Sequence, residues 1–210
     1  MELSLIWPIQ GYLCATYDRL DRDIMPELIE PDTERLRLRQ WLPEDRAPFA
    51  AMGMDREVME HFPTVLSRAE SDAFADHCQA SIEAQGWGFW AVECKHGSAF
   101  AGFVGLCALH ADLPFAPGVE IGWRLARRFW GRGLATEAAR AALQVGFERL
   151  GLDAIVSFTA ESNLRSRAVM ERLAMRHVAD FEHPLLPPGH ALSRHRLYRM
   201  DAGAFAAWRH

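Results

Sequence analysis

A glycine-containing turn between a strand pattern and a helix pattern constrains this chain more than any other feature. Residues 119–126 alternate as a strand does, and residues 133–150 have the apolar spacing of a long helix. Gly131 and Gly133 lie in the turn that joins them. The first N–H groups of a helix have no partner inside the helix, and its positive end favours anions. Because glycine lacks a Cβ, a phosphate group can approach the backbone of such a turn closely.

The remaining patterns predict a single α+β domain. Ser67 and Glu70 have the spacing of a capping box at the start of a helix, and Gly151 is placed to end the helix after the turn. We expect strands at about 33–39, 86–92, 99–109, 119–126, 154–158, 178–181 and 196–200, and helices opening at Pro43 and Ser67 and covering 133–150 and 163–173. The order β-α-α-β-β-β-α-β-α-β-β predicts a mixed central sheet without internal repeats.

Length and charge restrict the classes of function. The chain has 210 residues, half of them hydrophobic, which suits one domain at residues 31–210 preceded by an N-terminal extension at residues 1–30. The net charge of −5 argues against nucleic acid as the main partner. No apolar run reaches the roughly 18 residues of a membrane span, and the start lacks a basic segment, so we expect a cytoplasmic protein with no membrane partner.

The glycine turn belongs to a longer motif. Arg128-x-x-Gly131-x-Gly133 resembles the R/Q-x-x-G-x-G/A signature of the GNAT acetyltransferase superfamily. Its flanks, and a helix beginning Asn163-x-x-Ser166, look like the branch that contains the ribosomal-protein N-terminal acetyltransferases (RimJ/RimL-like). The resemblance spans about residues 32 to 200 and departs at Ala174, where the branch usually has glycine. It implies the GNAT fold, a mixed sheet of about six or seven strands with helices on both faces, and acetyl-CoA as co-substrate.

The resemblance also implies which residues hold the coenzyme. In this family the strand before the turn and the strand after the long helix splay apart, and the pantetheine arm lies between them. By resemblance, the backbone of three strand residues contacts the arm and the thioester: Trp123, Arg124 and Leu125. The pyrophosphate is then held by Arg128, Gly131, Arg132, Gly133, Leu134, Ala135 and Thr136. Asn163 bonds the arm from the opposite side with Ser166 nearby, although Asn163 is equally well placed as a plain N-cap.

Glu120 is the candidate catalytic base. An amine must lose a proton to attack a thioester, and a carboxylate inside a central strand needs a wet cleft or a partner. Arg124 lies on the same strand face, but roughly 13 Å away along the strand, so we do not expect it to be that partner. The alternative is that Glu120 only positions the substrate or pairs with a distant arginine. The departing thiolate needs a proton, and many GNAT enzymes supply it from a tyrosine in the last helix. No tyrosine lies between Tyr17 and Tyr198 in this chain, so Ser166 is the candidate proton relay.

The segment from His183 to His195 contains histidines, but their spacing is not that of a metal site, so we predict no metal. For the position of this segment, a solvated loop is favoured over a wall of the acceptor cleft. The sequence thus predicts an N-acetyltransferase that acts on a primary amine, either a protein N-terminus or a small-molecule amine. The alternative class is a non-catalytic acyl-CoA-binding or regulatory domain. The sequence leaves open whether the chain forms a homodimer.

Overall fold

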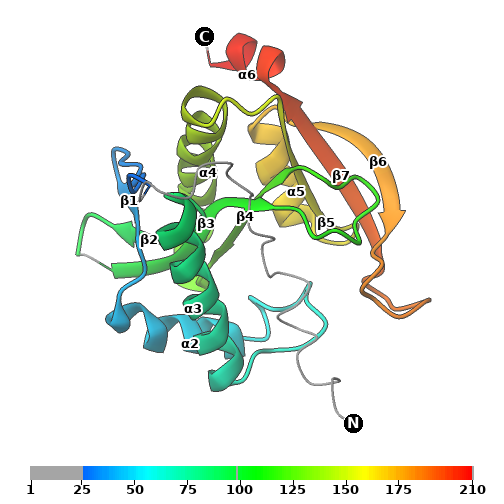
Figure 1. Ribbon diagram of the computed structural model, residues 1–210. Helices are drawn as coiled ribbons and strands as arrows, with labels where there is room; N and C mark the ends of the chain where they lie inside the picture. The colour runs from blue at the N-terminus through cyan, green and yellow to red at the C-terminus, as the bar shows by residue number, and fades with distance from the viewer. Residues whose placement is uncertain (1–25, 98, 210) are drawn as a thin grey trace.

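A seven-stranded mixed sheet forms the centre of the molecule, with strand order β1-β2-β3-β4-β5-β7-β6 (Figure 1). The computed structural model describes residues 26–97 and 99–209, so most of the expected N-terminal extension lies outside the described residues. The strands are β1 Leu36–Arg39, β2 Phe89–Cys94, β3 Ala99–Ala108, β4 Val119–Leu125, β5 Ala154–Ala160, β6 Arg176–Glu182 and β7 Arg194–Asp201. The helices are α2 Arg46–Met54, α3 Arg68–Gln85, α4 Leu134–Gln144, α5 Leu164–Arg172 and α6 Ala202–Trp208. The expected fold class is confirmed, and so is the order of elements up to β7, after which one further helix, α6, follows.

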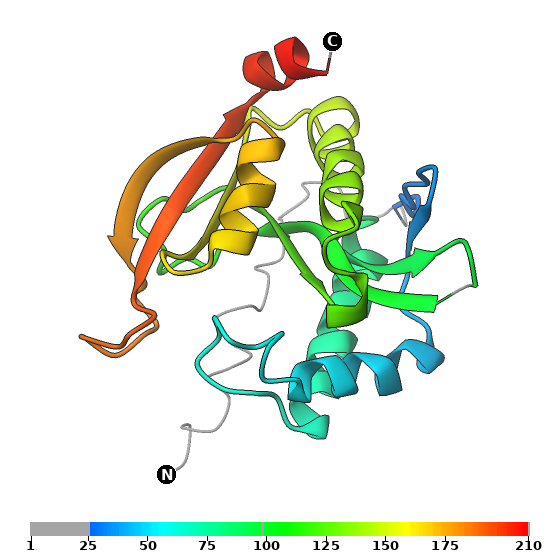
Figure 2. The same ribbon diagram turned by 180° about the vertical axis from the view of Figure 1, so that it is seen from behind.

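Helices cover both faces of the sheet. Helices α2 and α3 pack on β3 and β2, whereas α4 packs on β3 and β4 and α5 packs on β5. The view from behind shows α4 and α5 together on the face opposite α2 and α3 (Figure 2). The part of the chain that the structure describes contains no helix long and apolar enough to cross a membrane.

The sheet opens between β4 and β5. These two parallel strands share a single register pair, Glu120 with Val156, near the start of both strands. By contrast, β3 and β4 stay paired from Ala108–Val119 to Gly102–Leu125. Because β4 and β5 run in the same direction and lose register after one pair, their carboxyl ends diverge. The splay that the family resemblance implies is therefore present.

One glycine explains how closely β3 approaches β4 at the edge of this opening. Gly102 has φ +139°, and a Cβ placed there would lie 2.1 Å from the backbone oxygen of Arg124. No side chain fits at that distance, so only glycine allows the two backbones to meet here. The close approach fixes the carboxyl end of β4, which leads into the glycine turn.

Helix α3 begins and ends on local signals. The Ser67 hydroxyl accepts from the Glu70 N–H, and the Glu70 carboxylate accepts from the Ser67 N–H, so the expected capping box is confirmed. Gly86 ends the helix in the left-handed conformation at φ +84°. Strand β2 consequently starts at Phe89, and the prediction that it begins at Gly86 was wrong.

Three other local expectations need correction. The helix expected over 133–150 is α-helical only to Gln144 and finishes as a π-helical turn over Val145–Arg149. Helix α6 was not predicted. Arg35, Arg37 and Arg39 alternate with two leucines, a pattern that predicts a solvated face for the arginines, yet Arg39 is buried and donates to Asp45 and Glu93 at 2.6 and 2.7 Å. The bond to Asp45 raises the pKa of Arg39, so this buried cation stays charged.

Candidate active site

A cavity of about 770 Å³ lies where β4 and β5 diverge. The two splayed strands, the glycine turn with the start of α4, helix α5 and the loop before α3 form most of its wall, and single side chains of β2, β3 and β7 complete it. Most of the predicted site residues line it, namely Glu120, Trp123, Arg124, Leu125, Gly131, Gly133, Leu134, Ala135, Thr136, Asn163 and Ser166. Residues that are far apart in the sequence thus surround one space.

The glycine turn leaves room for a ligand. Gly131 and Gly133 have φ of +70° and +75°, and Gly133 is the N-cap of α4. A Cβ at Gly131 would meet nothing within 4 Å, and one at Gly133 would meet only Arg35 Nη2 at 3.6 Å. Glycine offers no side chain to cap the helix, so the first N–H groups of α4 face the cavity uncapped. The turn therefore fits a phosphate, because it combines open space with backbone donors at a helix N-terminus.

The segment just before β1 braces this turn. Glu137, in the first turn of α4, accepts from the Arg35 backbone N–H at 3.0 Å and from Arg35 Nε at 2.6 Å. It also accepts from the Thr33 hydroxyl at 2.6 Å, and Arg35 Nη1 donates to the Arg132 carbonyl at 3.0 Å. Burial would raise the pKa of Glu137, but the bonds from Thr33 and Arg35 lower it overall. An ionised Glu137 thus holds the turn against the start of β1.

Two predicted phosphate-binding arginines are not among the cavity-lining residues. Arg128 Nη2 donates to the Phe100 carbonyl at 3.4 Å, and its guanidinium lies 4.8 Å from the centre of the Phe129 ring. Arg132 is exposed and contributes its backbone carbonyl to the brace. Their part in coenzyme binding remains a prediction, whereas the glycines and the start of α4 already border the cavity.

Glu120 is half-buried in the wall of the cavity. Burial raises its pKa to about 8, from an ordinary value of 4.5. Strand alternation places Gly122 and Arg124 on the same face as Glu120, and all three residues line the cavity. The Arg124 guanidinium is buried, 4.2 Å from the centre of the Phe62 ring and 5.3 Å from that of Phe103. A carboxyl group with a pKa near 8 can hold or release a proton at neutral pH.

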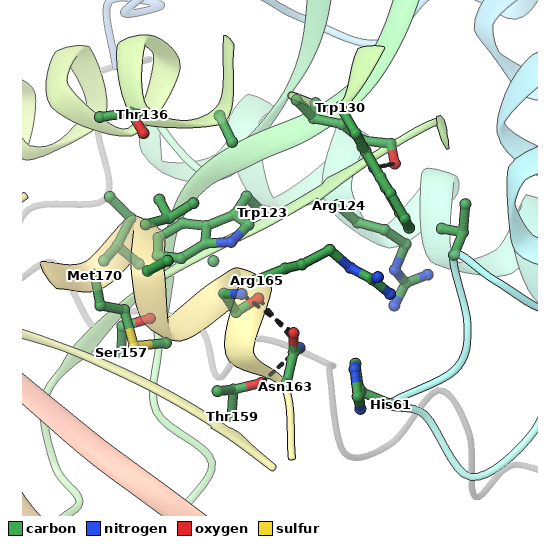
Figure 3. Close-up of a pocket in the computed structure, with 18 of the residues that line it drawn as sticks. His61, Trp123, Arg124, Trp130, Thr136, Ser157, Thr159, Asn163, Arg165 and Met170 are labelled. Carbon is green, nitrogen blue, oxygen red and sulfur yellow. Dashed lines mark hydrogen bonds between the residues drawn. The ribbon is translucent and has the colours of Figure 1, made fainter. Parts of the chain in front are cut away.

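Asn163 organises the β5 side of the cavity. Its side-chain carbonyl accepts from the Ser166 backbone N–H at 3.1 Å, which confirms the N-cap of α5. This bond fixes the orientation of the amide, whose nitrogen donates to Thr159 Oγ1 at 2.9 Å and to Ser166 Oγ at 3.2 Å (Figure 3). Because Ser166 Oγ accepts this bond, its own proton is directed elsewhere. The side-chain carbonyl of Asn163 keeps one lone pair for a further donor.

The loop at residues 55–66 is tied to both sides of the opening. Glu57 pairs with Arg127, which follows β4, at 2.7 Å. Glu60 pairs with Arg165 of α5 at 2.6 Å, and the Arg165 guanidinium lies 4.6 Å from the Trp130 ring centre. His61, from the same loop, lies at the end of the cavity where Arg124 and Arg165 also point (Figure 3). The sequence patterns gave no signal for Arg165 or Trp130, because their positions follow from ion pairs and ring contacts between distant segments.

The histidine-containing segment is more buried than expected. His195 lies on β7, is buried and lines the cavity, and His183 is half-buried against it with the ring centres 4.8 Å apart. The prediction that a solvated loop is favoured was therefore wrong for these two residues, because they pack into an aromatic cluster with Phe158 and Phe181. Within the described residues no group of three or more histidine, cysteine and acidic side chains is arranged to hold a metal ion.

Comparison with known proteins gives consistent matches. Residues 35–176 match the model of the acetyltransferase (GNAT) domain. The chain is 30% identical to the FsC-acetyl coenzyme A-N(2)-transacetylase of Aspergillus fumigatus over 84% of this chain and 85% of that protein. Its fold resembles the acetyltransferase (GNAT family) from Bacillus anthracis, with a TM-score of 0.71 and 22% identity over 83% of this chain and 99% of that chain. It also resembles the RimL ribosomal L7/L12 alpha-N-protein acetyltransferase in complex with coenzyme A, with a TM-score of 0.64 and 17% identity over 83% and 98% of the two chains.

Proposed function

This chain belongs to the GNAT acetyltransferase family and is an N-acetyltransferase, and from this premise we propose that it binds acetyl-CoA in the described cavity and acetylates a primary amine there. One observation carries the proposal. A single cavity joins the glycine turn and the start of α4 to a carboxyl group with a pKa of about 8. A phosphate cradle and a group able to take a proton are the two requirements for attack of an amine on a coenzyme A thioester.

The coenzyme is held along the β4 side of the cavity. The N–H groups of Leu134, Ala135 and Thr136 and the open space at Gly131 and Gly133 accommodate the pyrophosphate, and Arg128 and Arg132 add positive charge nearby. Backbone groups of Trp123, Arg124 and Leu125 contact the pantetheine arm in the opening between the strands. One of these N–H groups stabilises the oxyanion that forms when the amine adds to the thioester carbonyl. The free lone pair of Asn163 Oδ1 receives a donor of the arm from the β5 side.

Proton transfer is assigned to Glu120 and Ser166. At pH 7 a group with a pKa of about 8 is ionised in about one molecule in ten, and this ionised form accepts the proton that the amine loses. Ser166 Oγ accepts from Asn163, so its hydroxyl is free to donate to the departing sulfur. A thiol has an ordinary pKa near about 8.5, so the thiolate needs only modest help to leave.

The acceptor is a protein N-terminus or a small-molecule amine. The RimL enzyme acts on an α-amino group of a protein, whereas the Aspergillus fumigatus relative acts at an N(2) nitrogen. An α-amino group has an ordinary pKa of about 7.7 to 8, and a lysine-like amine has about 10.4. An α-amino group is therefore the easier of the two to deprotonate near neutral pH, and both kinds of acceptor stay within the proposal. A cytoplasmic location and independence of metal ions are part of the same proposal.

A screen of amines with acetyl-CoA tests this function. The wild-type protein is incubated with acetyl-CoA and a panel of peptides with free N-termini, amino acids, polyamines and drug-like amines, and release of the coenzyme A thiol is followed. We expect turnover for at least one amine, together with acetyl-CoA binding by calorimetry. Tight binding without turnover for every amine would instead identify a non-catalytic acyl-CoA-binding domain. Absence of both binding and turnover would contradict the assignment of the cavity.

A further inference from the structure

We propose that His195 is a second catalytic residue, whose Nε2 accepts a proton from the acceptor amine at the β7 side of the cavity. This inference rests on the proposed function, because it concerns the acceptor of the same reaction. It assigns a role to a side chain that the sequence patterns placed in a solvated loop. Three observations support it, namely the face on which His195 lies, its tautomer and its surroundings, together with the number of protons that the reaction must remove.

The register of three strands puts His195 on the same sheet face as Glu120. Glu120 of β4 pairs with Val156 of β5, and His195 of β7 pairs with Ala160 of β5. Side chains of one strand alternate between faces, so Val156, Phe158 and Ala160 share a face. Glu120 and His195 therefore lie on that face too and both line the cavity, but Ala160 is four residues beyond Val156, so His195 lies roughly 13 Å further along the strands than Glu120.

The backbone selects one tautomer of His195. Its Nδ1 lies 3.1 Å from the carbonyl oxygen of Ser193, a group that can only accept. In the neutral ring Nδ1 therefore carries the proton, and Nε2 keeps an unprotonated lone pair. A lone pair at Nε2 is the form that an amine N–H can bond to and transfer its proton to.

The surroundings keep this ring neutral and in place. Its centre lies 6.1 Å from that of Phe158 on β5, 5.6 Å from that of Phe181 on β6, and 4.8 Å from that of His183. Burial lowers the pKa of His195, although the Ser193 carbonyl and the Glu182 carboxylate act in the opposite direction. His183 adds no charge at neutral pH, because burial, His195 and His110 lower its own pKa to about 4.

The number of protons lost by the acceptor nitrogen gives a role to a second base. An acceptor that enters as an ammonium ion loses two protons before it becomes an amide. In this scheme His195 takes the first proton, which frees the nitrogen lone pair, and passes it to solvent. The C–N bond then forms and the second proton leaves nitrogen through water to Glu120, because Glu120 lies too far along the strands to contact the same nitrogen as His195. The C–S bond breaks, and the thiolate takes up one proton as the free thiol. One proton is released overall.

Substitutions at His195 test the proposal in the full chain with acetyl-CoA and an amine that the wild type acetylates. His195→Gln keeps a hydrogen-bond acceptor but cannot take a proton, and His195→Phe keeps the ring contacts. We expect both variants to lose about 100-fold in kcat while their acetyl-CoA dissociation constants stay within twofold of wild type. The matched control is His190→Gln, because His190 lies in the same segment with Nδ1 accepting from the Leu192 N–H at 3.1 Å. It should keep wild-type turnover.

Rescue separates proton transfer from a structural role. In His195→Ala, added imidazole should raise kcat in proportion to its unprotonated concentration, which a change of packing would not produce. Turnover of His195→Gln within twofold of wild type, or no rescue by imidazole in a variant that still binds acetyl-CoA, would overturn the proposal. Failure of the proposed function itself is recognised separately, because the wild-type protein would then acetylate no amine.

Discussion

Glu137 accepts two hydrogen bonds from Arg35, one from its backbone N–H at 3.0 Å and one from Nε at 2.6 Å, although 102 positions separate the two residues. Arg35 also donates to the carbonyl of Arg132 inside the glycine turn. The segment just before β1 thereby fixes the position of the turn that follows β4. The glycine turn is thus held from outside by a segment that does not border the cavity.

This brace can be removed without entering the cavity. Glu137→Gln should weaken acetyl-CoA binding about fivefold, close to 1 kcal/mol, because the turn loses its fixed position and the first helical turn loses a negative charge. The Arg35 side chain is 44% exposed, so the loss of stability should be small. Asp72→Asn, which breaks the exposed Arg68–Asp72 pair on α3, is the control and should leave affinity unchanged. Equal affinity of Glu137→Gln and wild type in calorimetry would show that the brace does not act on binding.

Acetyl-CoA binding by the glycine turn can be tested by substituting Gly133, with a substitution at a glycine of similar positive φ outside the cavity as the control. Gly133→Glu should abolish acetyl-CoA binding, because a side chain and a negative charge would enter the space assigned to the pyrophosphate. Gly151→Glu introduces a residue at a similar positive φ, +65°, in open space outside the cavity. Both variants should lose similar stability in thermal unfolding, of order 1 kcal/mol, and only the first should lose binding. If Gly133→Glu bound acetyl-CoA normally, the phosphate assignment would be wrong.

The raised pKa of Glu120 predicts the pH dependence of turnover. A carboxyl group with a pKa of about 8 is protonated below that pH, so kcat at saturating amine should rise as the pH approaches 8 and then level off. Glu120→Gln should lower kcat about 100-fold and remove this rise, with acetyl-CoA affinity little changed. A rise near pH 8 that persists in Glu120→Gln would remove Glu120 from the role of base.

The same group predicts a change in stability. The pKa of Glu120 is higher in the folded chain than its ordinary value of 4.5, so the folded state binds more protons than the unfolded state between pH 4.5 and about 8. The contribution of Glu120 to stability should therefore decrease as the pH rises through that window. In thermal unfolding, the melting temperature of Glu120→Gln minus that of wild type should increase with increasing pH. A constant difference across the window would contradict the raised pKa.

Ser166 and Asn163 should respond differently to removal of their side chains. Ser166→Ala keeps the backbone N–H that Asn163 caps, so its melting temperature should stay near wild type while kcat falls about tenfold through loss of the proton relay. Asn163→Ala removes the cap and should cost about 1 kcal/mol of stability. Steady-state kinetics and thermal unfolding of the two variants distinguish these effects. Wild-type kcat in Ser166→Ala would exclude the hydroxyl from the reaction.

Features carried by neighbouring residues could be predicted from the sequence. The capping box of Ser67 and Glu70, the glycine turn and the N-cap Asn163 were all predicted, because a few consecutive residues satisfy each of them. The ends of elements were less well predicted, since the π-helical turn after Gln144 and helix α6 follow from how these segments pack. The burial of Arg39 depended on Asp45 and Glu93, which no alternation pattern reveals.

The sequence by itself determined the order of strands and helices, the glycine turn at Gly131 and Gly133 that leads into an uncapped helix, and a carboxylate on the strand before it. Local hydrogen bonding and hydrophobic periodicity are sufficient for these features. Only the tertiary structure decided the pKa of Glu120 and the placement of His195, because both depend on burial and on strands distant in sequence. The pairing of β5 with β4 and β7 brings these two groups onto one face of the sheet, and no pattern within a single strand contains that pairing.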